Sequence, residues 1–166
     1  MQQLELIDQS GPGWHLAPEP GAVYSALRAA RETAHDAFTR YVGQWERSVL
    51  ACLPPEPPLD RPSAEDFIAA LWLRHATNWS PFFISTPALV IVEEPRTAEC
   101  SWDQHQVIVS ADMMRKPVLL HECAHLMVWY DVNHGLAFRE TLMALWSAEF
   151  GIDPARALKL ASEHGL

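Results

Sequence analysis

Two histidines and a glutamate in the second half of the chain have the types and spacing that metal chemistry requires. His121, Glu122 and His125 belong to the stretch His-Glu-Cys-Ala-His. Residues four apart in a helix lie on the same face, so the imidazoles of His121 and His125 can reach one metal ion. The carboxylate of Glu122 then lies beside that ion. We expect the two histidines to be ligands and Glu122 to be a general base, not a ligand.

A catalytic zinc site normally has three protein ligands and a water molecule, so this motif needs one more ligand. His134 is the best candidate, because it follows closely in the chain and precedes Gly135, where the backbone can turn back. Glu149 and Glu140 lie further downstream and are open alternatives. The sequence therefore predicts a Zn²⁺ site made by His121, His125 and His134.

The predicted site would activate water for hydrolysis. Bound zinc makes its water far more acidic, and Glu122 would take the proton and direct attack on a carbonyl carbon. Hydrolysis of an amide bond is the natural outcome. The residue that stabilises the oxyanion is not identified, and the weak candidates are Tyr130, Asn133 and His105. Asp131 and Glu140 could orient a ligand imidazole, although a solvated carboxylate is the commoner explanation for each.

The elements that position these residues follow from hydrophobic periodicity. Apolar residues recur at intervals of three and four over about residues 21–53, which predicts a helix with a kink or break at Gly43. The proline-rich stretch 54–62 cannot form a helix or a central strand and predicts an extended connector. Ser63 and Asp66 resemble a capping box, which predicts that the next helix begins at about residue 64 and ends near residue 76.

The sheet and the remaining helices are predicted from β-branched runs and turn residues. Residues 88–92 form a short apolar run typical of a buried strand, and 97–102 with 106–110 indicate a hairpin. The helix that carries the histidines should span about 115–129, with Pro117 in its first turn. The last two helices should span about 136–150, ending at Gly151, and about 154–163, beginning after Asp153.

Composition limits the possible classes of function. A length of 166 residues predicts one domain, residues 1–166, with an irregular tail over 1–20. The net charge of -9 disfavours binding to nucleic acid, which needs a basic surplus. Three cysteines without a C-x-x-C pair indicate reduced thiols. Without a signal segment or a long apolar run, we expect a cytoplasmic protein that does not enter a membrane.

The metal motifs also carry a family resemblance. His-Glu-x-x-His followed by His-Gly-x-x-Phe, here 121–125 and 134–138, resembles the core of SprT-like zinc metalloproteases. Over about residues 20–166 the chain is similar to a family of actinobacterial HExxH metallohydrolases. That similarity includes the helix start at Val23-Tyr24, the strand before Leu119-Leu120-His121-Glu122, and the helix that ends near Gly151. Only the metal motifs in it are specific.

The resemblance implies an α+β, zincin-like fold. Such a fold would have N-terminal helices, a small, mainly antiparallel sheet, the HExxH helix and C-terminal helices. An edge strand beside the HExxH helix would accommodate an extended substrate. The resemblance also implies His121, His125 and His134 as zinc ligands and Glu122 as the catalyst. The chain lacks the cysteine-paired zinc ribbon and the basic surface of SprT-like proteases, which argues against a role on DNA.

Two functions from different classes are therefore open. The first is a zinc-dependent metallohydrolase, most simply a metallopeptidase that acts on a peptide or protein. The second is a non-catalytic binding or regulatory module that zinc stabilises. Glu122 favours the enzyme, because a structural zinc site needs no general base and usually closes its fourth position with a protein ligand. The identity of the substrate and the oligomeric state are not predicted.

Overall fold

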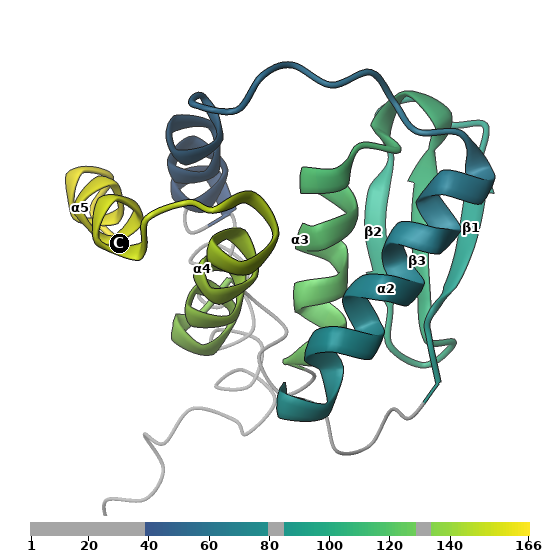
Figure 1. Cartoon of the computed structure of the whole chain (residues 1–166). Coiled ribbons are helices and arrows are strands. Elements are labelled where there is room, and N and C mark those ends of the chain that lie inside the picture. The colour runs from purple at the N-terminus through teal and green to yellow at the C-terminus, as the bar shows by residue number, and fades with distance from the viewer. Residues whose placement is uncertain (1–38, 80–84, 129–133) are drawn as a thin grey trace, which may run out of the picture. The chain divides into compact units, whose positions relative to one another are not determined.

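The described residues form a mixed α+β fold. The structure, a computed structural model, describes residues 39–79, 85–128 and 134–166, all of which lie in one unit of the chain, 37–166. Residues 39–50 are helical and precede the elements labelled in Figure 1. These elements are α2 (Arg61–Trp79), β1 (Ala88–Val92), β2 (Ala98–Ser101), β3 (Gln106–Ser110), the 3-10 turn η2 (Ala111–Met113), α3 (Lys116–Met127), α4 (Leu136–Phe150) and α5 (Pro154–Glu163).

The sheet is mixed, which corrects the expectation that it is mainly antiparallel. Its strand order is β1-β3-β2, with β1 parallel to β3 and β2 antiparallel to β3. The chain passes from β1 to β2 across the position that β3 then occupies, so the β2–β3 hairpin places β3 between them. Strand β2 is thereby left at an edge of the sheet formed by the described residues.

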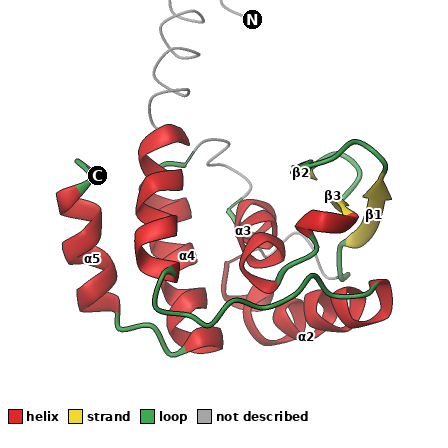
Figure 2. Ribbon diagram, turned by 90° about the horizontal axis from the view of Figure 1, so that it is seen from above, coloured by secondary structure: helices red, strands yellow, loops and turns green. Residues whose placement is uncertain are grey.

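Helix α3 lies between the sheet and α4, as Figures 1 and 2 both show. It contacts α2 and β2 as well as α4. Most of its side chains are buried, and Leu119, Leu120, Cys123, Ala124, Leu126 and Met127 are wholly so. Because most of the helix surface packs against neighbouring elements, its backbone is held firmly, and the three polar residues of the motif are held with it.

The N-terminal helical residues 39–50 are fixed to the C-terminal helices. Trp45 donates a hydrogen bond from Nε1 to the carbonyl of Ala157 at 2.8 Å. Its ring also packs against Trp146, with centroids 5.0 Å apart. The helix continues through Gly43 without the break that the sequence suggested as one possibility. The predicted helical residues before 39 lie outside the described part of the chain.

Helix α2 begins earlier than predicted. Its first residue is Arg61, and the Asp60 carboxylate accepts a hydrogen bond from the backbone N–H of Ser63 at 2.9 Å. Asp60 is therefore the N-cap, in place of the expected pair Ser63 and Asp66. Pro62 permits this because it fits the first helical turn, where a missing N–H costs nothing.

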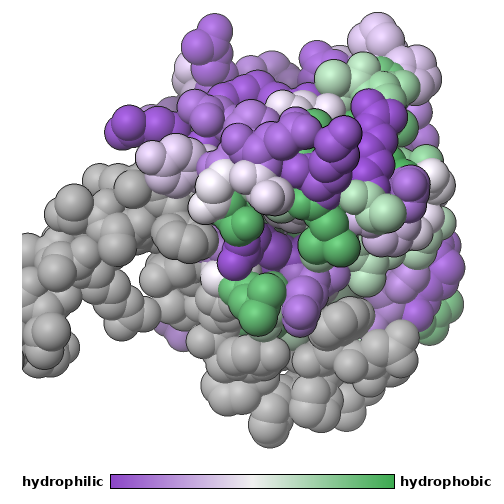
Figure 3. Space-filling model, turned by 90° about the vertical axis from the view of Figure 1, so that its left-hand side faces the viewer, coloured by the Kyte–Doolittle hydropathy of each residue, from purple (hydrophilic) through white to green (hydrophobic). Residues whose placement is uncertain are grey.

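The last two helices have the predicted ends. Gly151 ends α4 in the left-handed conformation at φ 65°, and the Asp153 side chain caps α5 by accepting from Ala155 N–H. In Figure 3, the described residues on the face that carries α5 are mostly hydrophilic, and the hydrophobic residues lie in small groups. Within the described ranges, no helix combines the length and the apolar character that crossing a membrane requires.

Candidate metal centre

The three histidines come from two adjacent pieces of the chain. His121 and His125 lie one turn apart on α3, and His134 immediately precedes Gly135, the N-cap of α4. His125 and His134 are buried, and the His121 side chain is 17% exposed. Since α3 and α4 pack against each other, the residue before α4 is brought beside the face of α3 that carries the other two histidines.

The imidazole nitrogens are spaced as the ligands of one ion would be. Nε2 of His121 lies 3.2 Å from Nε2 of His125 and 3.2 Å from Nε2 of His134. Ligand atoms of all three residues lie within 4.8 Å of one another. An ion held tetrahedrally at 2.0–2.1 Å from each nitrogen would set neighbouring nitrogens about 3.3 Å apart. The three histidines could therefore hold a metal ion.

The Nδ1 atoms of His121 and His134 face residues of the helix over 39–50. Nδ1 of His121 lies 2.7 Å from Oε1 of Glu46, and Nδ1 of His134 lies 3.4 Å from Oγ1 of Thr39. A proton on Nδ1 of His121 that is donated to Glu46 leaves the Nε2 lone pair available for an ion. Burial lowers the pKa of His121, but the charge and hydrogen bond of Glu46 outweigh this and raise the pKa overall.

Glu46 is a polar partner of the histidine cluster that the sequence pattern did not predict. Asp131, one of the two expected orienting residues, lies outside the described part of the chain, and the Glu140 side chain is exposed. The sequence did contain a signal, because Glu46 occurs beside Trp45 within an apolar stripe whose members Val42, Trp45 and Val49 are fully buried. A carboxylate on the inner side of an amphipathic helix needs a partner. What the sequence did not give was the partner itself, 75 residues away.

Phe138 packs against all three imidazoles. Its ring is stacked on His125, with centroids 4.1 Å apart and an interplanar angle of 25°. It meets His121 at 5.0 Å and His134 at 4.8 Å, in both cases with the rings steeply inclined. The side chain is fully buried on the first turn of α4. The spacing of His-Gly-x-x-Phe thus brings one imidazole and an apolar support for all three imidazoles into the same place.

Glu122 lies beside the histidines in an environment suited to proton transfer. Its side chain is buried, with 6% exposed, and it lines a cavity of about 330 Å³ together with His121, Glu46 and Arg47. Burial raises the pKa of Glu122 to about 7, His121 opposes this, and the charges of Glu46 and Glu99 add to it. A carboxyl with a pKa near neutral pH can both accept and return a proton.

The alternative ligand Glu149 has other partners. Its carboxylate receives hydrogen bonds from Arg74, at 3.1 and 2.6 Å, and lies 2.7 Å from Nε2 of His75. Among the described residues, the group that could hold an ion consists of the three histidines. His75 on α2 therefore shares the Glu149 carboxylate with Arg74.

Of the three expected oxyanion candidates, His105 lies among the described residues, and it is not part of the three-histidine group. His105 lies against Ser85, whose carbonyl is 2.7 Å from Nε2, and its ring packs edge-on against Trp72 at 5.0 Å. Tyr130 and Asn133 lie outside the described residues.

Comparisons with protein-family models, with curated proteins and with solved structures found no match to this chain. Conclusions about function therefore rest on the geometry and chemistry of the centre.

Proposed function

We propose that the chain is a zinc-dependent metallohydrolase, and specifically a metallopeptidase. His121, His125 and His134 would hold the zinc ion, and Glu122 would be the general base. The observation that carries this proposal is the convergence of three imidazoles, with Nε2 of His121 3.2 Å from Nε2 of each of the other two, next to a buried glutamate that faces a cavity. A purely structural ion would need neither the glutamate nor the cavity.

The donor set favours zinc over other ions. Three neutral imidazoles suit zinc, and the spacing of their nitrogens fits its tetrahedral coordination. When bound, zinc would acidify a water molecule and polarise the substrate carbonyl. Glu122 would accept the proton of the attacking water and return it to the leaving amine. Glu46 holds His121 in the tautomer that presents Nε2.

The edge strand β2 supports a peptide as the substrate. The backbone N–H of Ser110 donates to the carbonyl of Thr97 at 2.9 Å, so these two residues form a hydrogen-bonded pair. In antiparallel strands, hydrogen-bonded pairs alternate with pairs that share no hydrogen bond. The next pair, Ala98 with Val109, is of the second kind, so the backbone N–H and C=O of Ala98 point away from β3. Ala98 also lines the cavity of Glu122. An extended peptide can therefore add to β2 beside the proposed catalytic residue.

The test combines metal content with peptide hydrolysis. Protein purified without chelator should contain about one zinc per chain and should cleave members of a peptide library. Glu122→Gln should keep the zinc and lose hydrolysis, whereas Glu140→Gln, which changes an exposed glutamate, should retain both. His134→Ala should lose the zinc.

Each contrary outcome has a defined meaning. Zinc retained in His134→Ala would contradict the three-histidine site. Zinc lost from Glu122→Gln as readily as from His125→Ala would contradict the role of Glu122 as a base. Wild-type protein that holds zinc but cleaves no peptide would instead favour a non-catalytic zinc-stabilised module.

A further inference from the structure

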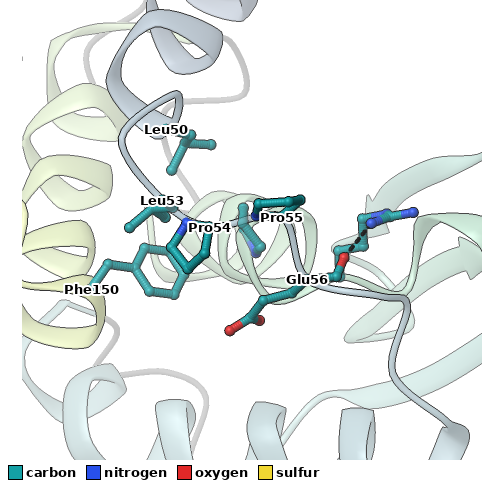
Figure 4. A pocket seen from close by; sticks show the side chains of 8 residues that line it. Leu50, Leu53, Pro54, Pro55, Glu56 and Phe150 are labelled. Atoms are coloured by element: carbon teal, nitrogen blue, oxygen red, sulfur yellow. Dashed lines mark hydrogen bonds between the residues drawn. The ribbon is translucent and has the colours of Figure 1, made fainter.

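A second hollow continues the cavity of Glu122 toward the ends of the helices. Figure 4 shows this hollow, which we name the outer groove and whose volume is about 270 Å³. Its apolar lining consists of Leu50, Leu53, Pro54, Pro55, Pro117 and Phe150. Leu50 and Pro117 line the cavity of His121 and Glu122 as well. The two hollows therefore adjoin at these two side chains.

The helices set the distance between the histidines and the outer groove. Pro117 precedes His121 by one helical turn on α3, and Leu50 follows Glu46 by one turn. The contact between Glu46 and His121 places these two turns side by side. Four residues of helix span about 6 Å, which is the length of about two residues of extended peptide. A chain whose reacting bond lies at the histidines thus reaches the outer groove about two residues away.

The chemistry of the outer groove suits an apolar side chain. Leucine, proline and phenylalanine side chains form its walls, and Figure 4 shows Leu53, Pro54 and Phe150 close together. The charged groups at its rim are already engaged, because Arg115 donates to the Glu56 carbonyl and Lys116 lies 3.3 Å from the Glu56 carboxylate. Two consecutive prolines fix the backbone of one wall, so this wall loses little conformational freedom when a ligand binds.

We propose that the outer groove binds an apolar side chain of the peptide substrate, two to four residues from the bond that is cleaved. This inference rests on the proposed peptidase function, because that function supplies the occupant. Burial of a leucine-sized side chain there should improve binding about 10–100-fold over serine. The outer groove would thus contribute to specificity without taking part in the chemistry.

The test measures binding, so it does not depend on turnover. The probes are two capped alanine hexapeptides, one carrying a single leucine and the other a serine at the same position. They are added at millimolar concentration to protein with ¹³C-labelled leucine methyl groups, both without zinc and as zinc-loaded Glu122→Gln. The methyl signals of Leu50 and Leu53 should shift with the leucine peptide. Leu73 and Leu158, which are 82% and 55% exposed on other helices, are the internal controls.

Variants sharpen this test. Leu53→Ser should weaken binding of the leucine peptide about tenfold, and Leu158→Ser should leave it unchanged. Pro54→Ser, at an exposed position that is safer for folding, should also weaken binding. Equal shifts at Leu73 and Leu158, or no shift at Leu53 in either form of the protein, would overturn the proposal.

The two proposals fail in different ways. Peptide binding in the outer groove without hydrolysis by the wild type would support the binding role of this groove and contradict the peptidase function. Hydrolysis of a peptide library with no preference for apolar residues two to four positions from the cleaved bond would support the peptidase function and contradict the binding role of the groove.

Discussion

Replacement of Glu46 tests whether a carboxylate outside the histidine cluster controls metal binding. Oε1 of Glu46 lies 2.7 Å from Nδ1 of His121, and the side chains are only 16% and 17% exposed. Such a bond fixes the imidazole orientation and increases the basicity of Nε2. We expect Glu46→Ala to weaken zinc binding more than Glu46→Gln, because the glutamine amide oxygen can still accept the hydrogen bond although the charge is lost.

The magnitude follows from the shielding of this contact. Loss of an outer partner of a metal-bound histidine lowers affinity about 10–100-fold, or about 1.4–2.7 kcal/mol. Water that entered the space left by Glu46→Ala would restore neither the carboxylate charge nor the fixed orientation of the imidazole, because both side chains are mostly covered in the wild type. We therefore expect a loss near 100-fold for Glu46→Ala and near tenfold for Glu46→Gln.

Competition with a chromophoric zinc chelator measures these affinities. Glu65→Gln is the matched control, since it removes a glutamate that pairs with Arg61 at 2.7 Å but is 48% exposed. Circular dichroism without zinc shows whether each variant is folded. If folded Glu46→Ala binds zinc within about twofold of the wild type while His121→Ala does not bind it, Glu46 has no role in zinc binding. An equal loss in Glu65→Gln would indicate a general effect of charge.

Three further substitutions test other parts of the centre and its support. Without zinc, burial raises the pKa of Glu122 to about 7, so only the ionised carboxylate destabilises the fold. Glu122→Gln should therefore raise the free energy of unfolding by up to about 3 kcal/mol near pH 8. Near pH 4, where Glu122 is protonated, the substitution should leave this free energy unchanged. Urea unfolding checks this, and equal changes at both pH values would contradict it. Burial raises the pKa of Glu149, but Arg74 and His75 outweigh it and hold this pKa below its ordinary value. Glu149→Gln should thus lower the free energy of unfolding by about 1–2 kcal/mol at neutral pH, with the deficit shrinking below about pH 4.5 as wild-type Glu149 protonates. Its zinc content should be unchanged, and lost zinc would restore Glu149 as a ligand. Phe138→Leu should remain folded and bind zinc several-fold more weakly in the chelator assay, because the smaller side chain supports the three imidazoles less well. Unchanged affinity would mean that the ring only fills the core.

The elements whose bounds were predicted best are those in which hydrophobic periodicity agrees with the proline, glycine and capping residues at their ends. The run 88–92 lies between prolines and forms β1 with the expected bounds, although it is not the buried strand that was expected, because only Leu89 is buried and Ile91 is exposed. The helix predicted over 136–150 ends where Gly151 can adopt positive φ. The convergence of His121, His125 and His134 was also predictable, because their separation in sequence is short and one helix orders two of them.

The features that were missed depend on contacts between distant residues. Local pattern does not distinguish a hairpin that continues a sheet from one that places its second strand beside an earlier parallel strand. At the start of α2, either Asp60 or Ser63 could have capped the helix. Asp60 is the cap because Pro62 is acceptable in the first turn. Glu46 was recognisable as a carboxylate on an apolar face, but only the packing of Trp45 against Trp146 and Ala157 shows where that face lies.

The helix over residues 39–50 therefore decides what the three histidines can do. Local spacing on α3 brings His121 and His125 together, and Glu46 and Thr39 lie against the Nδ1 atoms of His121 and His134. The same helix supplies Leu50, where the outer groove meets the cavity of Glu122. Substitutions that loosen Trp45 from Ala157 should consequently weaken metal binding and apolar recognition together, because one rigid element positions both.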